Sequence, residues 1–159
     1  MSKLIILGAP LTGKTTLTKK LRETVTIPVL DFDEELMKLN NGKYPANYPT
    51  LNEQLRSEII KTISVMNEVI FFAFEIDLDA IQNMKLNGFN IVQLTAPYDV
   101  LEKRNKERLK NDPDNDAFQY VLKNIEYQKT VSGARLVDKT IDTSEETPSD
   151  TLRSITELL

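Results

Sequence analysis

One segment near the start of the chain, Gly8–Thr15, constrains the fold more than any other. Its sequence, GAPLTGKT, matches the pattern G-x-x-x-x-G-K-[ST] at every fixed position. The apolar run Lys3–Leu7 precedes it and predicts a buried strand, and the amphipathic run Thr16–Arg22 after it predicts a helix. A strand, a glycine-containing turn and a helix in this order are typical of a phosphate-binding loop. A chance glycine turn with an exposed lysine would not explain the flanking pattern.

The spacing of this motif suits the phosphates of a nucleoside triphosphate. Backbone N–H groups of such a loop and of the following helix N-terminus bind anions, and its glycines permit a close approach that a Cβ would hinder. We expect Lys14 to face the β- and γ-phosphates of ATP rather than the core, and the Thr15 hydroxyl to bind Mg²⁺. The residues predicted to bind the nucleotide are Gly8, Ala9, Pro10, Leu11, Thr12, Gly13, Lys14, Thr15 and Thr16.

Composition restricts the chemistry further. The chain has 159 residues, a single-domain length, and contains no cysteine and no histidine. Acid–base catalysis therefore falls to carboxylates or lysines, and disulfides are excluded. We see no signal peptide and no apolar stretch of membrane-spanning length, so we expect a cytoplasmic protein without a membrane partner. The net charge of −4 argues against broad nonspecific nucleic-acid binding, although it leaves a local basic site open.

Apolar runs alternate with helical patterns along the whole chain. Further strands are expected at 27–30, 69–74, 89–94 and 137–141, and helices at 34–39, 51–66, 78–86, 98–109, 117–129 and 149–159. Residues 43–50 are expected to form a loop. Strands separated by helices predict a five-stranded parallel sheet covered on both faces, which is a three-layer α/β/α domain spanning residues 1–159.

Two aspartates, Asp31 and Asp33, follow the predicted second strand. They lie at the carboxyl edge of the sheet, where open α/β folds bind ligands. If the backbone stays extended there, both side chains point the same way. We assign Asp31 to Mg²⁺ and Asp33 to the proton of an attacking hydroxyl, with the reverse assignment open. The alternative makes Asp33 the N-cap of the helix 34–39.

Two arginines, Arg104 and Arg108, are one helical turn apart and share a face. Guanidinium groups bind phosphate in a bidentate manner and stabilise charge on a transferred phosphoryl group. The polar segment Asn111–Asn115 follows them, so we expect a small lid near 103–116 that carries both arginines. The alternative is a solvated helix face whose charges pair with nearby acids.

Weaker candidates line the same predicted edge. Glu75 or Asp77 follows the third strand, in the place of a second metal-binding acid, although a helix N-cap explains Asp77 equally well. Arg56 is a candidate for contact with the phosphoryl acceptor. Tyr44 is expected either to stack on a base or sugar, or to pack its own loop.

With these residues placed, the chain resembles the P-loop kinases of small molecules and nucleotides, which include adenylate kinase, shikimate kinase, gluconate kinase and polynucleotide kinase. The segment 5–10, IILGAP, resembles the opening of adenylate kinases, with Leu11 in place of the usual glycine. The triplet 31–33 is similar to the D-x-D of shikimate kinases. Arg104 and Arg108 resemble the R-x-x-x-R of the helix that leads into the lid. The shikimate kinase glycine triplet is missing.

The resemblance implies strand order 2-3-1-4-5, and ATP and Mg²⁺ as cofactors. It also implies phosphoryl transfer catalysed by Lys14, Asp31, Asp33, Arg104 and Arg108, with Thr15 and Asp31 as metal ligands. The expected acceptor is a nucleoside, nucleotide or nucleic-acid hydroxyl or phosphate, including a nucleic-acid 5′ end. Two alternatives remain: a kinase of a small hydroxylated metabolite, similar to shikimate or gluconate kinase, and an NTPase without an acceptor.

Overall fold

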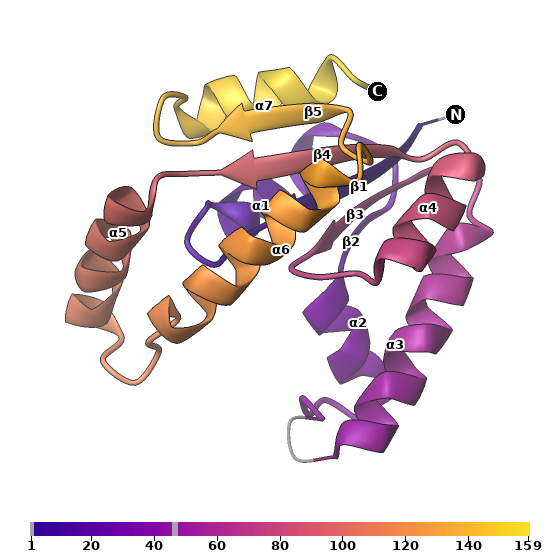
Figure 1. Ribbon diagram of the computed structural model, residues 1–159, viewed down its shortest axis with the longest axis horizontal. Helices are drawn as coiled ribbons and strands as arrows, with labels where there is room; N and C mark the ends of the chain where they lie inside the picture. Colours follow the sequence, from indigo (N-terminus) through magenta and orange to yellow (C-terminus); the bar gives the residue numbers. More distant parts are fainter. Residues whose placement is uncertain (1, 46–47) are drawn as a thin grey trace.

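Five short strands form one parallel sheet at the centre of the molecule (Figure 1). The computed structural model describes residues 2–45 and 48–159, so that 46–47, inside the predicted loop 43–50, lie outside the described residues. The strands are β1 (Lys3–Gly8), β2 (Val29–Asp31), β3 (Val69–Ala73), β4 (Asn90–Thr95) and β5 (Lys139–Asp142). Their order in the sheet is β2-β3-β1-β4-β5, which confirms the predicted topology.

Helices cover both faces of this sheet. They are α1 (Lys14–Thr24), α2 (Phe32–Leu39), α3 (Pro49–Ser64), α4 (Leu78–Leu86), α5 (Tyr98–Asn111), α6 (Val121–Gly133) and α7 (Pro148–Thr156), with a 3₁₀ turn η1 (Phe118–Tyr120) before α6. Residues of α1 and α7 pack on one face, and residues of α2, α3, α4 and α6 pack on the other. The predicted three-layer α/β/α architecture is therefore confirmed. No helix in the described part of the chain is long and apolar enough to cross a membrane.

Alternation along the central strands divides the core between the two faces. In β1, Ile5 and Leu7 belong to the cluster with α3 and α4, whereas Leu4 and Ile6 belong to the cluster with α1 and α7. Every residue of β3 is buried. Because the central strands are apolar on both faces, the polar groups of this fold collect at the ends of the strands.

One boundary matters for the site: α2 begins at Phe32, two residues before the predicted start. Asp31 Oδ1 accepts hydrogen bonds from the backbone N–H groups of Asp33 (3.0 Å) and Glu34 (3.2 Å), so Asp31 is the N-cap. The expected extended backbone through Asp33 is wrong, and so is the alternative that made Asp33 the cap.

Candidate active site

The loop between β1 and α1 has the backbone geometry of an anion cradle. Leu11 (φ 70°) and Gly13 (φ 91°) are both in the left-handed region, and they turn the chain into the first turn of α1. A Cβ on Gly8 would lie 2.8 Å from Thr12 Oγ1, which itself donates a hydrogen bond to Ala9 O at 2.7 Å. Among the described residues no side chain caps α1. The N–H groups of its first turn are therefore available to a phosphate.

Lys14 lies within this loop rather than reaching out of it. It is only 7% exposed, and its Nζ donates to Gly8 O (2.5 Å) and Ala9 O (3.1 Å). The ammonium also lies 3.6 Å from the centroid of the Phe74 ring. Burial lowers the pKa of this amine to about 7, an effect that Asp31 and Asp33 partly oppose. Lys14 is therefore buried within the loop, and carbonyl oxygens hold its amine where phosphate oxygens would bind.

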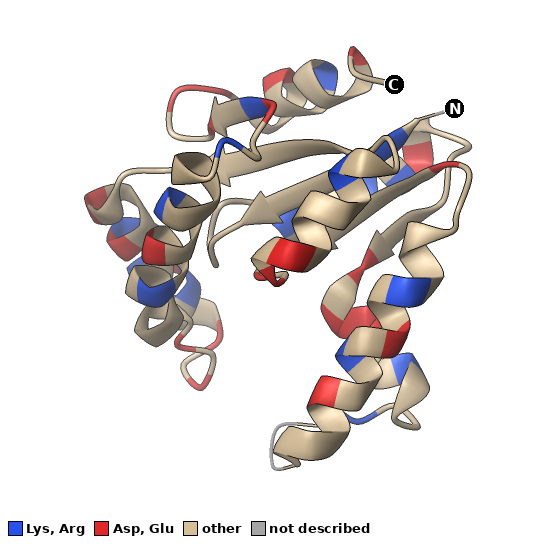
Figure 2. Ribbon diagram, turned by 45° about the vertical axis from the view of Figure 1, so that its right-hand side comes forward, with Lys and Arg blue, Asp and Glu red and all other residues tan. Residues whose placement is uncertain are grey.

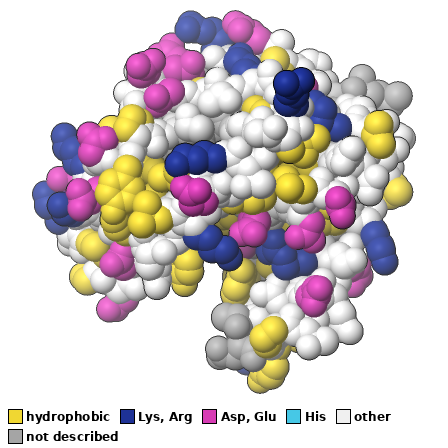
Figure 3. Space-filling model, in the orientation of Figure 1, with side chains coloured by type: hydrophobic (Ala, Val, Ile, Leu, Met, Phe, Trp, Pro, Cys, Tyr) yellow, Lys and Arg dark blue, Asp and Glu magenta, His cyan; other side chains and the backbone are white. Residues whose placement is uncertain are grey.

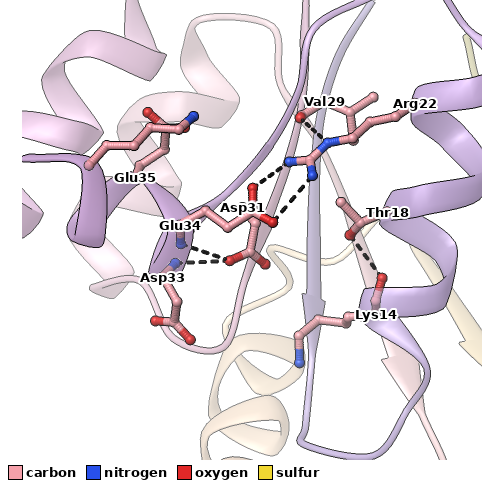
Figure 4. Close-up of polar contacts among 9 residues, drawn as sticks. Lys14, Thr18, Arg22, Val29, Asp31, Asp33, Glu34 and Glu35 are labelled. Atoms are coloured by element: carbon pink, nitrogen blue, oxygen red, sulfur yellow. Dashed lines mark hydrogen bonds and ion pairs between the residues drawn. The ribbon is translucent and has the colours of Figure 1, made fainter. Parts of the chain in front are cut away.

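The two predicted acids both lie within electrostatic range of Lys14 (Figure 4). Burial raises the pKa of each carboxyl, and in Asp33 the charge of Asp31 adds to the rise while Lys14 opposes it. Arg22 holds this end of α2 in place: it donates to Val29 O (3.0 Å) and to the Glu34 carboxylate (2.6 Å). The sequence therefore located the acids correctly, although a capped helix rather than an extended strand presents them.

The residues present fit a magnesium ion bound mainly through phosphates. Thr15 is exposed in the first turn of α1, and only Oδ1 of Asp31 takes part in the cap of α2. No group of three His, Cys, Asp or Glu side chains gathers as a metal site within 2–45 and 48–159. Mg²⁺ commonly takes one or two protein oxygens and completes its shell with substrate phosphates and water. Thr15 and Asp31 together match that requirement.

These groups open into a cleft of about 2480 Å³ between the α2–α3 side and the α5–α6 side of the molecule (Figure 3). Its lining includes Lys14, both predicted aspartates, and side chains of α3 and α6. A second pocket of about 250 Å³ lies next to the loop. It is lined by Leu11, Thr12, Gly13, Thr16, Leu17, Arg104, Thr143, Glu146, Pro148 and Thr151.

The structure separates the two predicted arginines between these two spaces. Arg104 donates to Leu11 O (3.1 Å), Thr143 Oγ1 (3.0 Å) and Thr143 O (2.7 Å), and it lines the small pocket. Arg108 is exposed and lines the large cleft. Their neighbours Lys106 and Lys110 pair with glutamates of the same helix, at 3.6 Å and 2.9 Å, and charges of both signs mix along α5 (Figure 2). Arg108 is therefore the arginine of this helix that faces the large cleft.

The weaker candidates lie where α3, α6 and the loop after β3 line the cleft. Arg56 Nη2 donates to Glu75 O at 2.7 Å, and its guanidinium lies 4.4 Å from the Phe32 ring centroid. The Glu75 carboxylate is 3.7 Å from Lys123 Nζ. Asp77 precedes α4, and its side chain makes no capping hydrogen bond to a described residue. All four charged residues line the cleft.

Two further residues of this region carry no sequence signal. Asn124 donates through Nδ2 to Phe74 O at 2.9 Å and lines the cleft. The Tyr127 hydroxyl donates to Ile76 O at 2.7 Å and accepts from Ile76 N at 2.9 Å. Both lie on α6 and fix the loop after β3, about 50 residues away along the chain. In the sequence they are ordinary polar positions of an amphipathic helix.

Solved structures with this architecture include small-molecule kinases. Shikimate kinase from Acinetobacter baumannii, in complex with shikimate, is 20% identical, with 99% of this chain and 93% of that chain covered and a TM-score of 0.71. A gluconokinase from Sinorhizobium meliloti is 12% identical, with 99% and 90% covered and a TM-score of 0.66. The YorR protein from Bacillus subtilis, in complex with phosphorylated GDP, is 15% identical, with 99% and 95% covered and a TM-score of 0.69. This chain has the fold of the P-loop kinases.

No family model and no curated protein matches the chain. The P-loop kinase fold predicted from the loop and the strand pattern is confirmed. Two of the three neighbours named are kinases of small metabolites. Among these three neighbours, the alternative acceptor class, a small hydroxylated metabolite, is represented twice, and a nucleotide is represented once.

Proposed function

We propose that the protein is a kinase that transfers the γ-phosphoryl group of ATP to a hydroxyl of a small molecule. The observation that carries the proposal is the juxtaposition of Lys14, Asp31 and Asp33 at the mouth of an uncapped α1. A donor-rich cradle for phosphates then adjoins carboxylates that can accept a proton. An NTPase without an acceptor would have no use for a cleft that extends well beyond the phosphate site.

Each group of the site has a defined task under this proposal. Residues 8–16 bind the phosphates, and Thr15 and Asp31 would hold Mg²⁺, which would neutralise phosphate charge. Asp33 accepts the proton of the acceptor hydroxyl while the oxygen of that hydroxyl bonds to the γ-phosphorus. The bond from that phosphorus to the bridging β–γ oxygen breaks, and ADP leaves with the electron pair. Lys14 and Arg108 stabilise the negative charge on the phosphoryl group in the transition state of transfer.

The small pocket is the proposed site of the nucleotide base. It adjoins Leu11 and Gly13 of the phosphate loop, and the side chain of Arg104 forms part of its wall. A flat guanidinium face suits stacking with a purine. In this arrangement Arg104 binds the nucleotide through the base, and Arg108 binds it through the phosphates.

The experiment is transfer from γ-labelled ATP with Mg²⁺ to a mixed panel of hydroxyl compounds, with and without Lys14→Ala. A labelled product that requires both the acceptor and Lys14 supports the kinase. Release of labelled phosphate at a rate that no acceptor changes would identify a hydrolase instead.

A further inference from the structure

We propose that the acceptor is an uncharged polyhydroxylated ring, such as a free sugar or the sugar of a nucleoside, and that Asn124 recognises one of its hydroxyl groups. The inference rests on the proposed function and specifies the substrate class of the same site. Shikimate, which the Acinetobacter neighbour binds, is a carboxylate. The proposal therefore separates this chain from that neighbour by the charge of the molecule that it phosphorylates.

The first observation is a buried hydrogen-bond acceptor without a donor. Asn124 is 6% exposed, and its Oδ1 has no hydrogen-bond partner among the described residues. The orientation of the amide is fixed, because its Nδ2 donates to Phe74 O, and a flipped amide would bring two oxygens together. A buried acceptor left unpaired destabilises the folded protein. The oxygen is itself buried, so a hydroxyl of a ligand in the cleft that Asn124 lines would reach it after a small movement of the surrounding side chains.

The second observation is the charge of the groups around Asn124. Asp33 and Glu75 line the same cleft, and both present acceptor oxygens. Two cations lie close to these groups: Lys123 Nζ is 3.7 Å from the Glu75 carboxylate, and Arg56 donates to Glu75 O while its guanidinium covers the Phe32 ring. A carboxylate substrate would meet the like charge of Asp33 and Glu75, whereas hydroxyl groups supply donors for Asp33 and for Asn124 Oδ1.

The third observation is the presence of two tyrosines on the walls of the cleft. Tyr44 precedes α3 and Tyr120 ends η1; both are exposed and both line the cleft. Tyrosine offers an apolar ring face together with a hydroxyl at its edge. This combination suits a sugar ring, which presents C–H groups on its faces and hydroxyls at its rim. For Tyr44 the sequence left open whether the ring stacks on a ligand or packs its own loop. Tyr120, from a different part of the chain, lines the same cleft and favours stacking on a ligand.

The test compares matched acceptors that differ in charge. Initial rates with γ-labelled ATP are measured for glucose, ribose and the nucleosides, and for gluconate, glucuronate and shikimate. We expect kcat/KM at least about tenfold higher for the best uncharged acceptor than for any carboxylate, which corresponds to about 1.4 kcal/mol. A comparison of label incorporation into nucleosides and into free sugars distinguishes the two sources of the ring. Preferred labelling of a carboxylate overturns the proposal but leaves the kinase intact. No labelling of any acceptor overturns both.

The role of Asn124 is tested with Asn124→Leu and with deoxy analogues of the preferred acceptor. We expect KM for the acceptor to rise about tenfold while KM for ATP stays unchanged. The analogue that lacks the recognised hydroxyl should lose as much with the wild-type protein and nothing further with the variant. Asn83→Leu, an exposed asparagine on the α4 side of the cleft, is the matched control. Asn124→Ser, which keeps an acceptor oxygen, should recover part of the loss. An equal loss of ATP and acceptor binding in Asn124→Leu would mean that Asn124 acts only through Phe74.

Discussion

The two ends of the cleft present opposite kinds of group. At the nucleotide end, a short continuous segment presents backbone N–H groups together with the Lys14 ammonium, all of them donors. At the acceptor end, side chains from α2, the loop after β3 and α6 present oxygens: Asp33, Glu75 and Asn124. The donor end is complementary to an anion, and the acceptor end is complementary to hydroxyl groups. A phosphate group at the donor end and an adjacent polyol at the acceptor end would together complement the whole cleft.

Lys14→Ala should break the donor end completely. Loss of γ-phosphate stabilisation of about 4 kcal/mol lowers kcat about a thousandfold. The fold should persist, because the residue removed is a desolvated amine and not part of the apolar core. Rates and thermal melting are measured on the variant and on Lys129→Ala, an exposed lysine of α6. Wild-type turnover by Lys14→Ala would remove this loop from the mechanism.

Asp33→Asn should impair the acceptor end and spare the donor end. Without the proton acceptor we expect kcat to fall about a hundredfold, while the Kd for ATP stays near the wild-type value. Titration calorimetry with ATP and steady-state kinetics measure the two separately. Glu35→Gln, a carboxylate of the same helix that pairs with Lys38, is the control. Weakened ATP binding with unchanged kcat would transfer Asp33 to the nucleotide side.

Arg108→Ala should lower transfer more than it lowers stability. An exposed arginine that contributes a charged hydrogen bond to phosphate in the transition state accounts for about a tenfold loss in kcat. Lys106→Ala, also exposed on α5, is the matched control and should leave the transfer rate unchanged.

Arg104→Ala should behave differently, because it removes three hydrogen bonds between α5, the phosphate loop and Thr143. We expect it to lower the melting temperature, and a stable Arg104→Ala would contradict its structural role.

The affinity for ATP should fall as the pH rises above 7. Burial lowers the pKa of Lys14 to about 7, so the amine of the free protein loses its proton through this range. Bound phosphate favours the charged amine, so binding takes up a proton, and the affinity falls by up to about tenfold per pH unit. Calorimetry with a non-hydrolysable ATP analogue between about pH 7.5 and pH 9, in buffers of different ionisation enthalpy, measures both effects. A slope that survives in Lys14→Ala would assign the proton to another group.

The smallest effect separates the two tasks of Asp31. Asp31→Asn keeps an oxygen for the N-cap of α2 and should melt like the wild type, whereas Asp31→Ala should lose about 1 kcal/mol of unfolding free energy. Both variants should need more Mg²⁺ for half-maximal rate, since both lack the charge. Equal magnesium dependence in Asp31→Asn and the wild type would limit Asp31 to capping.

The difference between the two ends also explains what the sequence could predict. The donor end is one contiguous motif whose residue types follow from backbone geometry, so it was recognised from the sequence, and the resemblance to P-loop kinases implied the strand order. Asp31 and Asp33 were located because they follow a strand, but the start of α2 was misplaced, since a capping aspartate and an extended one have the same local pattern. Asn124 and Tyr127 could not be found, because their role depends on tertiary contacts with a loop about 50 residues away.

Hydrogen bonds in the middle of α5 fix both ends of the segment 106–115, which makes up most of the predicted lid 103–116. Arg104 ties this helix to the phosphate loop, and the next residue, Asn105, binds Asp116 Oδ1 (2.9 Å) and Ala117 N (3.3 Å). The segment between Asn105 and Asp116 is therefore held by hydrogen bonds at both of its ends. Arg108 lies one helical turn after Arg104. A small rotation of this segment would therefore move the Arg108 guanidinium only a short distance. We therefore expect the predicted lid to close through small movements of residues 106–115, which carry Arg108, while Arg104 and Asn105 stay in place.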